Sequence, residues 1–300
     1  MESSMPRKLR FQPEEWSTFF VTSRCIHSRF LLRPSNHSNQ LIIGVIAKGV
    51  SKFDIKLHAL CVMSNHYHLL LSSKNAQVLA QFMQFINGNI AREIGRLHGW
   101  REKFWSRRYV ATVVLDEHAA EERMQYILSN SVKERLVRHP RYWPGVHCYR
   151  TLVEGTSLQG VWINRTALHL NPHLKEHQVT EHLLLKLVRL PHLAELSEQK
   201  HRELMKSLTT QMLESLDISD KKFLGQKRVL NQNPTDVPSK TSRSPAPLCH
   251  TSSELLRSQF RRQFNDFVDA YKQAYEKLAK GLFKLEFPKG SIPPTAWAAA

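Results

Sequence analysis

The sequence predicts an α+β fold: a ferredoxin-like βαββαβ unit with an antiparallel sheet, one further helix, and a mainly helical C-terminal extension. Two observations carry this prediction. Strand and helix patterns alternate in the order β-α-β-β-α-β before residue 116, which is the order of a split βαβ unit. Beyond about residue 155 the sequence changes character and becomes rich in Leu, His, Lys and Glu.

Four segments have the composition of strands. Ser17–Ser23 is β-branched and aromatic, and Tyr109–Leu115 is similar. Ile55–Met63 and His66–Ser72 are separated only by Ser64-Asn65, which is a tight-turn signal. We therefore expect the second and third strands to form a hairpin within a single antiparallel sheet.

Helical spacing of apolar residues marks the intervening segments. It is found in 41–53 and again in 75–98, after a polar loop over 24–39. Asp116 is a suitable N-cap for a further helix that extends to about Val137. The first two helices are expected to cover one face of the sheet, which leaves the further helix free to pack near the hairpin.

The remainder of the chain divides by composition. Residues 168–216 are predicted to be helical, and 231–253, rich in Pro, Ser, Thr and Asn, are predicted to be a flexible linker. Helical periodicity returns after this linker. We expect four units, covering 14–155, 156–230, 231–253 and 254–285.

Charge is the strongest compositional clue. Lys and Arg number 43 against 26 Asp and Glu, a formal net charge of +17, which favours nucleic acid as a partner. An anionic membrane would fit the charge as well, but there is no apolar run of about 20 residues and no amphipathic anchor. The short basic N-terminus lacks the apolar core of a secretory signal, so a cytoplasmic location is expected. The four cysteines are too far apart for a zinc ribbon or a disulfide scaffold.

Two histidines are candidate metal ligands. His66 and His68 are two positions apart in a predicted strand, so they project from the same face while Tyr67 projects from the other. Two neutral imidazoles in this arrangement can bind one divalent ion. The alternative is a pair of half-exposed strand histidines with no ligand.

The further helix adds Tyr126 and Asn130, which are four residues apart and share a face. The amide oxygen of Asn130 could complete a metal site, with Tyr126 one turn away. The alternative is a tyrosine at the edge of the core and a solvated asparagine.

Four motifs occur in order, and together they resemble a known family. They are Phe20-Val-Thr-Ser-Arg24, Met63-Ser-Asn-His-Tyr-His-Leu-Leu-Leu71, Phe104-Trp-Ser-Arg-Arg-Tyr109 and Tyr126-Ile-Leu-Ser-Asn130. This series is similar to the single-tyrosine HUH transposases (IS200-like transposases), and most similar to those associated with repetitive extragenic palindromes. The resemblance covers about 16–155 and not the C-terminal half.

The resemblance implies a function and roles for individual residues. His66 and His68 would bind Mg²⁺ or Mn²⁺, Asn130 would be a further polar ligand, and Tyr126 would be the nucleophile. The expected substrate is single-stranded DNA with a hairpin. The product would be a 5′-phosphotyrosine link with a free 3′ hydroxyl, formed without a nucleotide cofactor. One departure is Ser131, where related proteins commonly have proline. Relatives are monomers or dimers, so both states stay open.

Basic and aromatic residues provide a candidate DNA-binding surface. Arginine and lysine hold phosphates, and aromatic rings stack on unpaired bases. The candidates are Trp105, Arg107, Arg108, Lys133 and Arg135. Any single charge among them is also compatible with an ordinary solvated surface. Two other functions stay open: a non-catalytic DNA-binding regulator derived from a transposase, and a metal hydrolase in which the histidines activate water.

Overall fold

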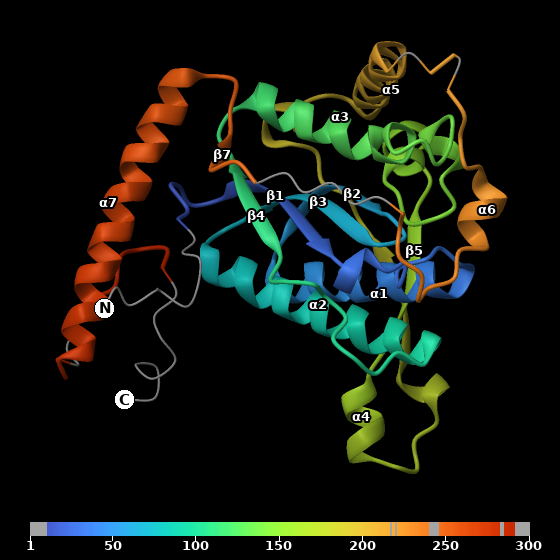
Figure 1. Ribbon diagram of the computed structural model, residues 1–300, viewed down its shortest axis with the longest axis horizontal. Helices are drawn as coiled ribbons and strands as arrows, with labels where there is room; N and C mark the ends of the chain where they lie inside the picture. Colours follow the sequence, from blue (N-terminus) through green and yellow to red (C-terminus); the bar gives the residue numbers. More distant parts are fainter. Residues whose placement is uncertain (1–10, 217, 220, 240–245, 283–284, 292–300) are drawn as a thin grey trace.

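The computed structural model describes residues 11–216, 218–219, 221–239, 246–282 and 285–291. A five-stranded sheet lies at its centre, with helices on both faces (Figure 1). The strands follow the order β2 (Lys56–Val62), β3 (His66–Ser73), β1 (Ser17–Arg24), β4 (Val110–Val114), β7 (Cys249–His250). The first four pair antiparallel to their neighbours, which confirms the predicted ferredoxin-like unit. β7 adds a short parallel strand beside β4.

The helices separate into two layers, as predicted. α1 (Asn36–Phe53) and α2 (Ala76–His98) lie on one face of the sheet, and α3 (Glu117–Lys133) lies on the other (Figure 1). α1 begins earlier than the apolar pattern indicated because the side chains of Ser35 and Ser38 each accept a hydrogen bond from the other's backbone N–H. This reciprocal capping satisfies donors that the first helical turn leaves unpaired.

α3 starts and ends for local reasons. Asp116 caps it, as predicted, by accepting a hydrogen bond from the backbone N–H of Ala119. The helix ends at Lys133 instead of continuing to Val137, because Arg135 adopts a left-handed backbone conformation with φ of 54°.

The two faces of β3 serve different purposes. Tyr67 faces the α1/α2 layer, where its hydroxyl donates to Asn87 Oδ1 of α2 at 2.6 Å. His66 and His68 face the α3 layer, and all residues of β3 are buried. On β3, the face toward α1/α2 therefore carries the buried Tyr67, Leu69 and Leu71, and the face toward α3 carries the two histidines.

Part of the extension differs from the prediction. Within the 168–216 stretch predicted to be helical, β6 (Thr180–Leu185) pairs antiparallel with β5 (Leu158–Ile163), and this hairpin packs on α1. The helices of this region are α4 (Arg165–Leu170) and α5 (Glu198–Ser215). The hairpin lies close to α1 because Gly44 and Gly160 meet: a Cβ on Gly44 would lie 2.0 Å from the carbonyl oxygen of Val161.

Both outer strands of the sheet pair with later segments of the chain. Residues 146–148 follow β2, with the N–H of Val62 donating to Val146 O and that of Cys148 to Leu60 O. At the other edge, β7 follows β4. α6 (Gln226–Leu230) leads into a segment that touches the β2–β3 turn, where the hydroxyl of Ser64 donates to Gln232 Oε1 at 2.6 Å.

The C-terminal arm is attached to the start of α3. Asp116 accepts hydrogen bonds from the hydroxyl of Thr251 at 2.5 Å and from the backbone N–H of Ser252 at 2.8 Å. The stretch 231–253 was predicted to be a flexible linker, but it contains strand β7. The backbone edge of β4 and the carboxylate of Asp116 hold this segment in place. Residues 240–245 of the predicted linker lie outside the described residues. α7 (Glu254–Ala279) follows and ends before the predicted residue 285. Figure 1 shows it standing apart from the sheet.

The four cysteines are all buried and unpaired, as their spacing indicated. No helix in the described ranges is long and apolar enough to cross a membrane.

Candidate active site

His66 and His68 lie side by side on β3. Their ring centroids are 4.9 Å apart and the rings are nearly perpendicular. A side-chain oxygen contacts the Nδ1 atom of each ring: His66 Nδ1 donates to Asn65 Oδ1 at 2.6 Å, and His68 Nδ1 is 2.8 Å from Thr22 Oγ1. These contacts fix the ring orientations and leave both Nε2 atoms directed elsewhere, as is usual for histidines that bind metals.

Both imidazoles are neutral at physiological pH. Burial, with a smaller contribution from the charge of Arg24, lowers the pKa of His66 to about 3. Burial also lowers the pKa of His68 well below its ordinary value, with contributions from His66, Arg24 and Arg123. A neutral imidazole has a lone pair for a metal ion, so the electrostatics favour the ligand form.

Tyr126 lies against this pair. The phenol ring of Tyr126 is 5.2 Å from the ring of His68, centroid to centroid, and stands perpendicular to it. Phe20 of β1 joins the two, since it stacks on His68 at 5.1 Å and meets Tyr126 edge-on at 5.6 Å. The helix and sheet thus bring together three residues that are up to 106 positions apart in the chain.

Three cations surround the phenol. Arg123 and Lys133 lie over its ring at 5.7 Å and 5.1 Å, one turn before it and two turns after it on the same helix face. Burial raises the pKa of the Tyr126 phenol, and the charge of Glu134 raises it further, whereas Arg123 and Arg24 act in the opposite direction. The ring is therefore partly buried in a positively charged setting.

The chemistry of the unpaired atoms fits a bound cation. His68 Nε2 and Asn130 Oδ1 are both buried, and neither has a hydrogen-bond partner among the described residues. Buried acceptors without partners are unfavourable unless something else satisfies them. Asn130, buried on α3 one turn after Tyr126, has the oxygen that a hard divalent ion accepts. Within the described ranges there is no group of three His, Cys, Asp or Glu side chains suited to a metal. What His66, His68 and Asn130 can offer a cation is two imidazole nitrogens and an amide oxygen.

Four residues near Tyr126 and the two histidines were not predicted from the sequence to belong to the site. The proximity of Phe20 and Arg24 to the histidines could be recognised only from the register between β1 and β3, which places Arg24 opposite His66. Arg123 could have been found from helix spacing, three residues before Tyr126. No sequence pattern pointed to His250, because it is 230 positions from Phe20 in the chain. In the structure the two rings meet edge-on, with 5.6 Å between their centroids. Burial and the charge of Arg123 lower the pKa of His250 to about 4.

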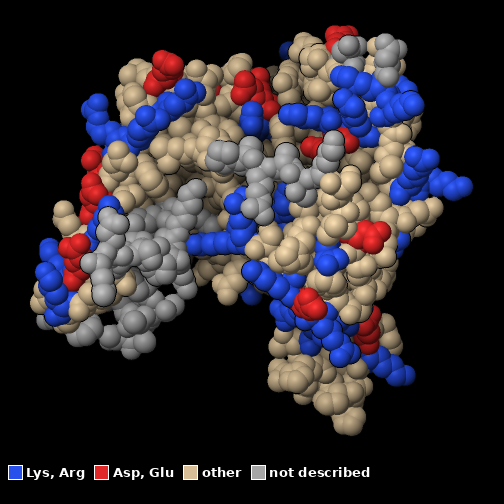
Figure 2. Space-filling view, in the orientation of Figure 1, with Lys and Arg blue, Asp and Glu red and all other residues tan. Residues whose placement is uncertain are grey.

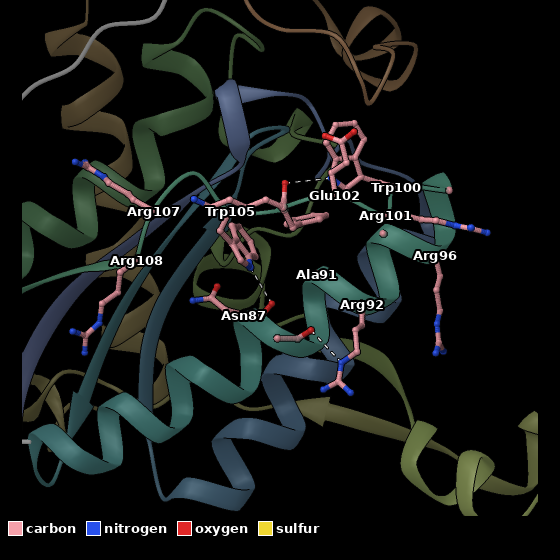
Figure 3. Close-up of a pocket in the computed structure, with 15 residues that line it drawn as sticks. Asn87, Ala91, Arg92, Arg96, Trp100, Arg101, Glu102, Trp105, Arg107 and Arg108 are labelled. Carbon is pink, nitrogen blue, oxygen red and sulfur yellow. Dashed lines mark hydrogen bonds between the residues drawn. The ribbon is translucent and has the colours of Figure 1, made fainter. Parts of the chain in front are cut away.

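A basic hollow lies next to α2, on the side of the sheet that Tyr67 faces. It has a volume of about 790 Å³ and lies between the C-terminal half of α2 and the loop to β4, where Lys and Arg side chains gather (Figure 2). Trp105 stands at its centre with Arg92, Arg96, Arg107 and Arg108 around it, pointing in different directions (Figure 3).

The predicted DNA-binding residues fall into two groups. Trp105 is half-buried, because its indole N–H donates to Asn87 O at 2.9 Å and its ring meets Tyr67 edge-on. It lines the hollow with Arg107 and Arg108. Lys133 and Arg135 are exposed at the end of α3, and Lys133 is beside Tyr126. The hollow is connected to the histidines through β1, since Ser106 N–H donates to Arg24 O.

Comparison with protein families decides what kind of domain this is. Residues 24–130 match the family model described as IS200-like transposase. Over these residues the chain is similar to the IS200-like transposases. The matched range includes His66, His68, Tyr126 and Asn130 and excludes the extension, so this part of the chain is transposase-like.

Two solved structures are also similar to part of this chain. A REP-associated tyrosine transposase bound to a REP hairpin is 17% identical, with a TM-score of 0.42, over 49% of this chain and 86% of that one. A protein of Deinococcus radiodurans R1 assigned as a transposase is 18% identical, with a TM-score of 0.30, over 42% of this chain and 95% of that one. No curated protein matches the chain.

Proposed function

We propose that this protein is a metal-dependent single-strand DNA endonuclease and strand transferase, in which Tyr126 attacks a DNA phosphodiester. The observation that carries the proposal is the position of the Tyr126 ring, 5.2 Å from His68 within the His66–His68 pair. A nucleophile and a phosphate-activating site must be adjacent for in-line attack.

The reaction is a phosphoryl transfer with no external energy source. The phenolic oxygen forms a bond to phosphorus, the bond from phosphorus to the 3′ oxygen breaks, and that oxygen leaves as a 3′ hydroxyl after taking up a proton. The phenolic proton is released to solvent. The 5′-phosphotyrosine link conserves the phosphodiester, so a second 3′ hydroxyl reverses the step and joins strands.

His66, His68 and Asn130 are the residues we propose to hold a divalent ion, Mg²⁺ or Mn²⁺. Bound there, the ion would act as a Lewis acid on the phosphate. Asn65 and Thr22 would fix the tautomers of the two imidazoles, so that each presents Nε2 to the ligand. The Phe20 ring stacked on His68 would keep water from one side of that histidine.

We propose that the DNA strand is bound by Trp105, Arg107 and Arg108 in the hollow, by Lys133 beside Tyr126, and by Arg135 just after α3. The formal charge of +17 supports a polyanionic partner. A hairpin-forming single strand is the proposed substrate because the ordered motifs resemble the palindrome-associated transposases. We assign the chemistry to residues 14–155 and propose an accessory role for 156–285, in a cytoplasmic protein.

The test is a covalent-adduct assay. The full chain is incubated with single-stranded hairpin oligonucleotides and Mn²⁺, and the products are separated under denaturing conditions. We expect a protein–DNA adduct with the wild type, none with Tyr126→Phe, and strongly reduced amounts with His66→Ala, His68→Ala or added chelator. An adduct that persists in Tyr126→Phe would refute the nucleophile assignment.

The same assay separates the two alternatives. A non-catalytic regulator would bind the hairpin tightly and in a salt-sensitive way, without nicking, and binding would not change in His66→Ala. A metal hydrolase would nick the strand without any adduct, and Tyr126→Phe would retain full activity. The Tyr126–His68 contact favours the transferase over both.

A further inference from the structure

We infer that Arg24 and Arg123 form an anion site beside Tyr126, and that this site holds the phosphate that is cut. The inference rests on the proposed function for the identity of the phosphate. It does not depend on the metal, on the hollow around Trp105, or on the extension.

Arg123 approaches the site from the helix. Its guanidinium lies over the Tyr126 ring at 5.7 Å and over the Phe20 ring at 5.9 Å, so it covers both aromatic residues next to His68. Its side chain is only 23% exposed. Arginine in this position stacks on aromatic rings with its flat face while the N–H groups at its edge stay available.

Arg24 approaches from the sheet. It is paired with His66 across β1 and β3, so the two side chains leave the same face of the sheet as near neighbours. The charge of Arg24 lowers the pKa of His66, His68 and Tyr126, and the charge of Arg123 lowers the pKa of His68 and Tyr126. His68 and Tyr126 therefore lie within reach of one arginine on β1 and another on α3.

Neither guanidinium is well neutralised. Arg123 Nε is buried and has no hydrogen-bond partner in the part of the chain that the structure describes, and the ion pair of Arg123 is with the neighbouring, exposed Glu122 at 3.5 Å. Arg24 has a 3.5 Å contact with the hydroxyl of Ser28, and no carboxylate of the described residues forms an ion pair with it. A partly buried guanidinium with little neutralisation is costly, and a bound oxyanion would interact favourably with both.

A phosphate is the anion that suits this geometry. Guanidinium groups bind tetrahedral oxyanions through paired N–H donors, and a DNA phosphodiester presents two free oxygens. Held between these arginines, the phosphorus would lie next to the phenolic oxygen that attacks it. The same charges would stabilise the phenolate and the charge that develops on the phosphate.

The first experiment tests the anion site without DNA or metal. Binding of tungstate, a tetrahedral oxyanion, is measured by calorimetry on the full chain in 0.15 M salt with chelator. We expect one dominant site in the wild type, about tenfold weaker binding in Arg24→Gln and in Arg123→Gln, and loss in the double variant. Arg262→Gln, which removes an exposed arginine of α7, is the matched control and should bind as the wild type does. Equal tungstate binding in all variants would overturn the inference.

The second experiment asks whether the bound anion is the scissile phosphate. Adduct formation on the hairpin should fall by about 100-fold in Arg123→Gln, the loss typical for one transition-state donor. A methylphosphonate at the cleaved position removes the negative charge of that phosphate. It should slow adduct formation by the wild type about as much as Arg123→Gln does, and should slow the Arg123→Gln variant much less. Additive losses would show that Arg123 and the phosphate act independently, and would overturn the assignment. Because this comparison includes the wild type with altered DNA, it remains informative if a variant folds poorly.

The two proposals fail in different ways. An adduct that forms equally fast in both arginine variants leaves the transferase in place and removes the arginine site. Tungstate binding that depends on the arginines, with no adduct on any hairpin, leaves the anion site in place and removes the transferase.

Discussion

The phenol of Tyr126 stands at 90° to the imidazole of His68, with 5.2 Å between the ring centroids. This edge-to-face contact is the geometry that aromatic rings prefer, so it contributes to the docking of α3 on the sheet as well as placing the hydroxyl. The ring and the hydroxyl of Tyr126 therefore have separable effects.

We predict that Tyr126→Phe abolishes the DNA adduct while changing the free energy of unfolding by less than about 0.5 kcal/mol, because the ring contacts with His68 and Phe20 are kept. Tyr126→Ala should lose both the adduct and the ring contacts, and its free energy of unfolding should fall by about 2 kcal/mol because a half-buried ring is removed. Urea denaturation and the adduct assay on the same samples provide the measurements. A large loss of stability in Tyr126→Phe would contradict the prediction.

Two helical glycines make a matched pair for the packing of the β5–β6 hairpin. A methyl group on Gly44 would meet the carbonyl of Val161 at 2.0 Å, so Gly44→Ala should destabilise the protein by about 1–3 kcal/mol. Gly88 of α2 has no atom within 4 Å of the added methyl, so Gly88→Ala should stabilise by about 0.5–1 kcal/mol through helix propensity. Chemical denaturation of both variants tests the contrast, and equal shifts would refute the close contact.

His58 predicts a pH dependence of stability. The ring is buried, Nδ1 donates to Val188 O and Nε2 accepts from the hydroxyl of Ser72, each at 2.8 Å. Burial lowers the pKa of His58 to about 4 in the folded protein, against 6.5 when unfolded. Between these values the unfolded chain binds more protons, so stability decreases as the pH falls.

The size of this effect follows from the shift. Between pH 7 and pH 5, wild type should lose roughly 2 kcal/mol more of its free energy of unfolding than His58→Gln, which cannot be protonated. The comparison between the two proteins cancels the contributions of the other buried histidines. Parallel pH profiles for the two proteins would show that His58 is not responsible.

The ion pair between Arg165 and Glu93 fastens the extension to α2. Glu93 is 6% exposed, and Arg165 donates to both of its oxygens. Arg165→Met should cost about 3 kcal/mol, because a buried carboxylate loses its partner. Glu176→Gln, which removes the exposed partner of the same arginine, should cost less than about 1 kcal/mol. Hydrogen exchange in β5 and β6 should rise only in the first variant.

Local patterns were sufficient to predict the transposase-like part of the chain. Strand composition, the Ser64-Asn65 turn and the Asp116 cap are short-range signals, and they placed His66, His68 and Tyr126 on the elements that carry them. The contacts among those residues could not be derived this way, because they depend on how β1, β3 and α3 pack.

The extension was harder to predict for a related reason. The 180–185 segment has leucines and charges that suit a helix, yet it pairs with β5, and the resulting hairpin packs on α1 where Gly160 meets Gly44. His250 and Arg24 reach the site through backbone pairing with distant strands, and one sequence contains no record of such pairing.

The pairing of residues 146–148 with β2 and of β7 with β4 has a consequence for assembly. An unpaired edge strand can pair with a strand of another molecule. Here later segments of the same chain hydrogen-bond to β2 and to β4. A truncation after residue 245 would expose the backbone of β4 at Val113 and Val114 and should make the protein prone to self-association.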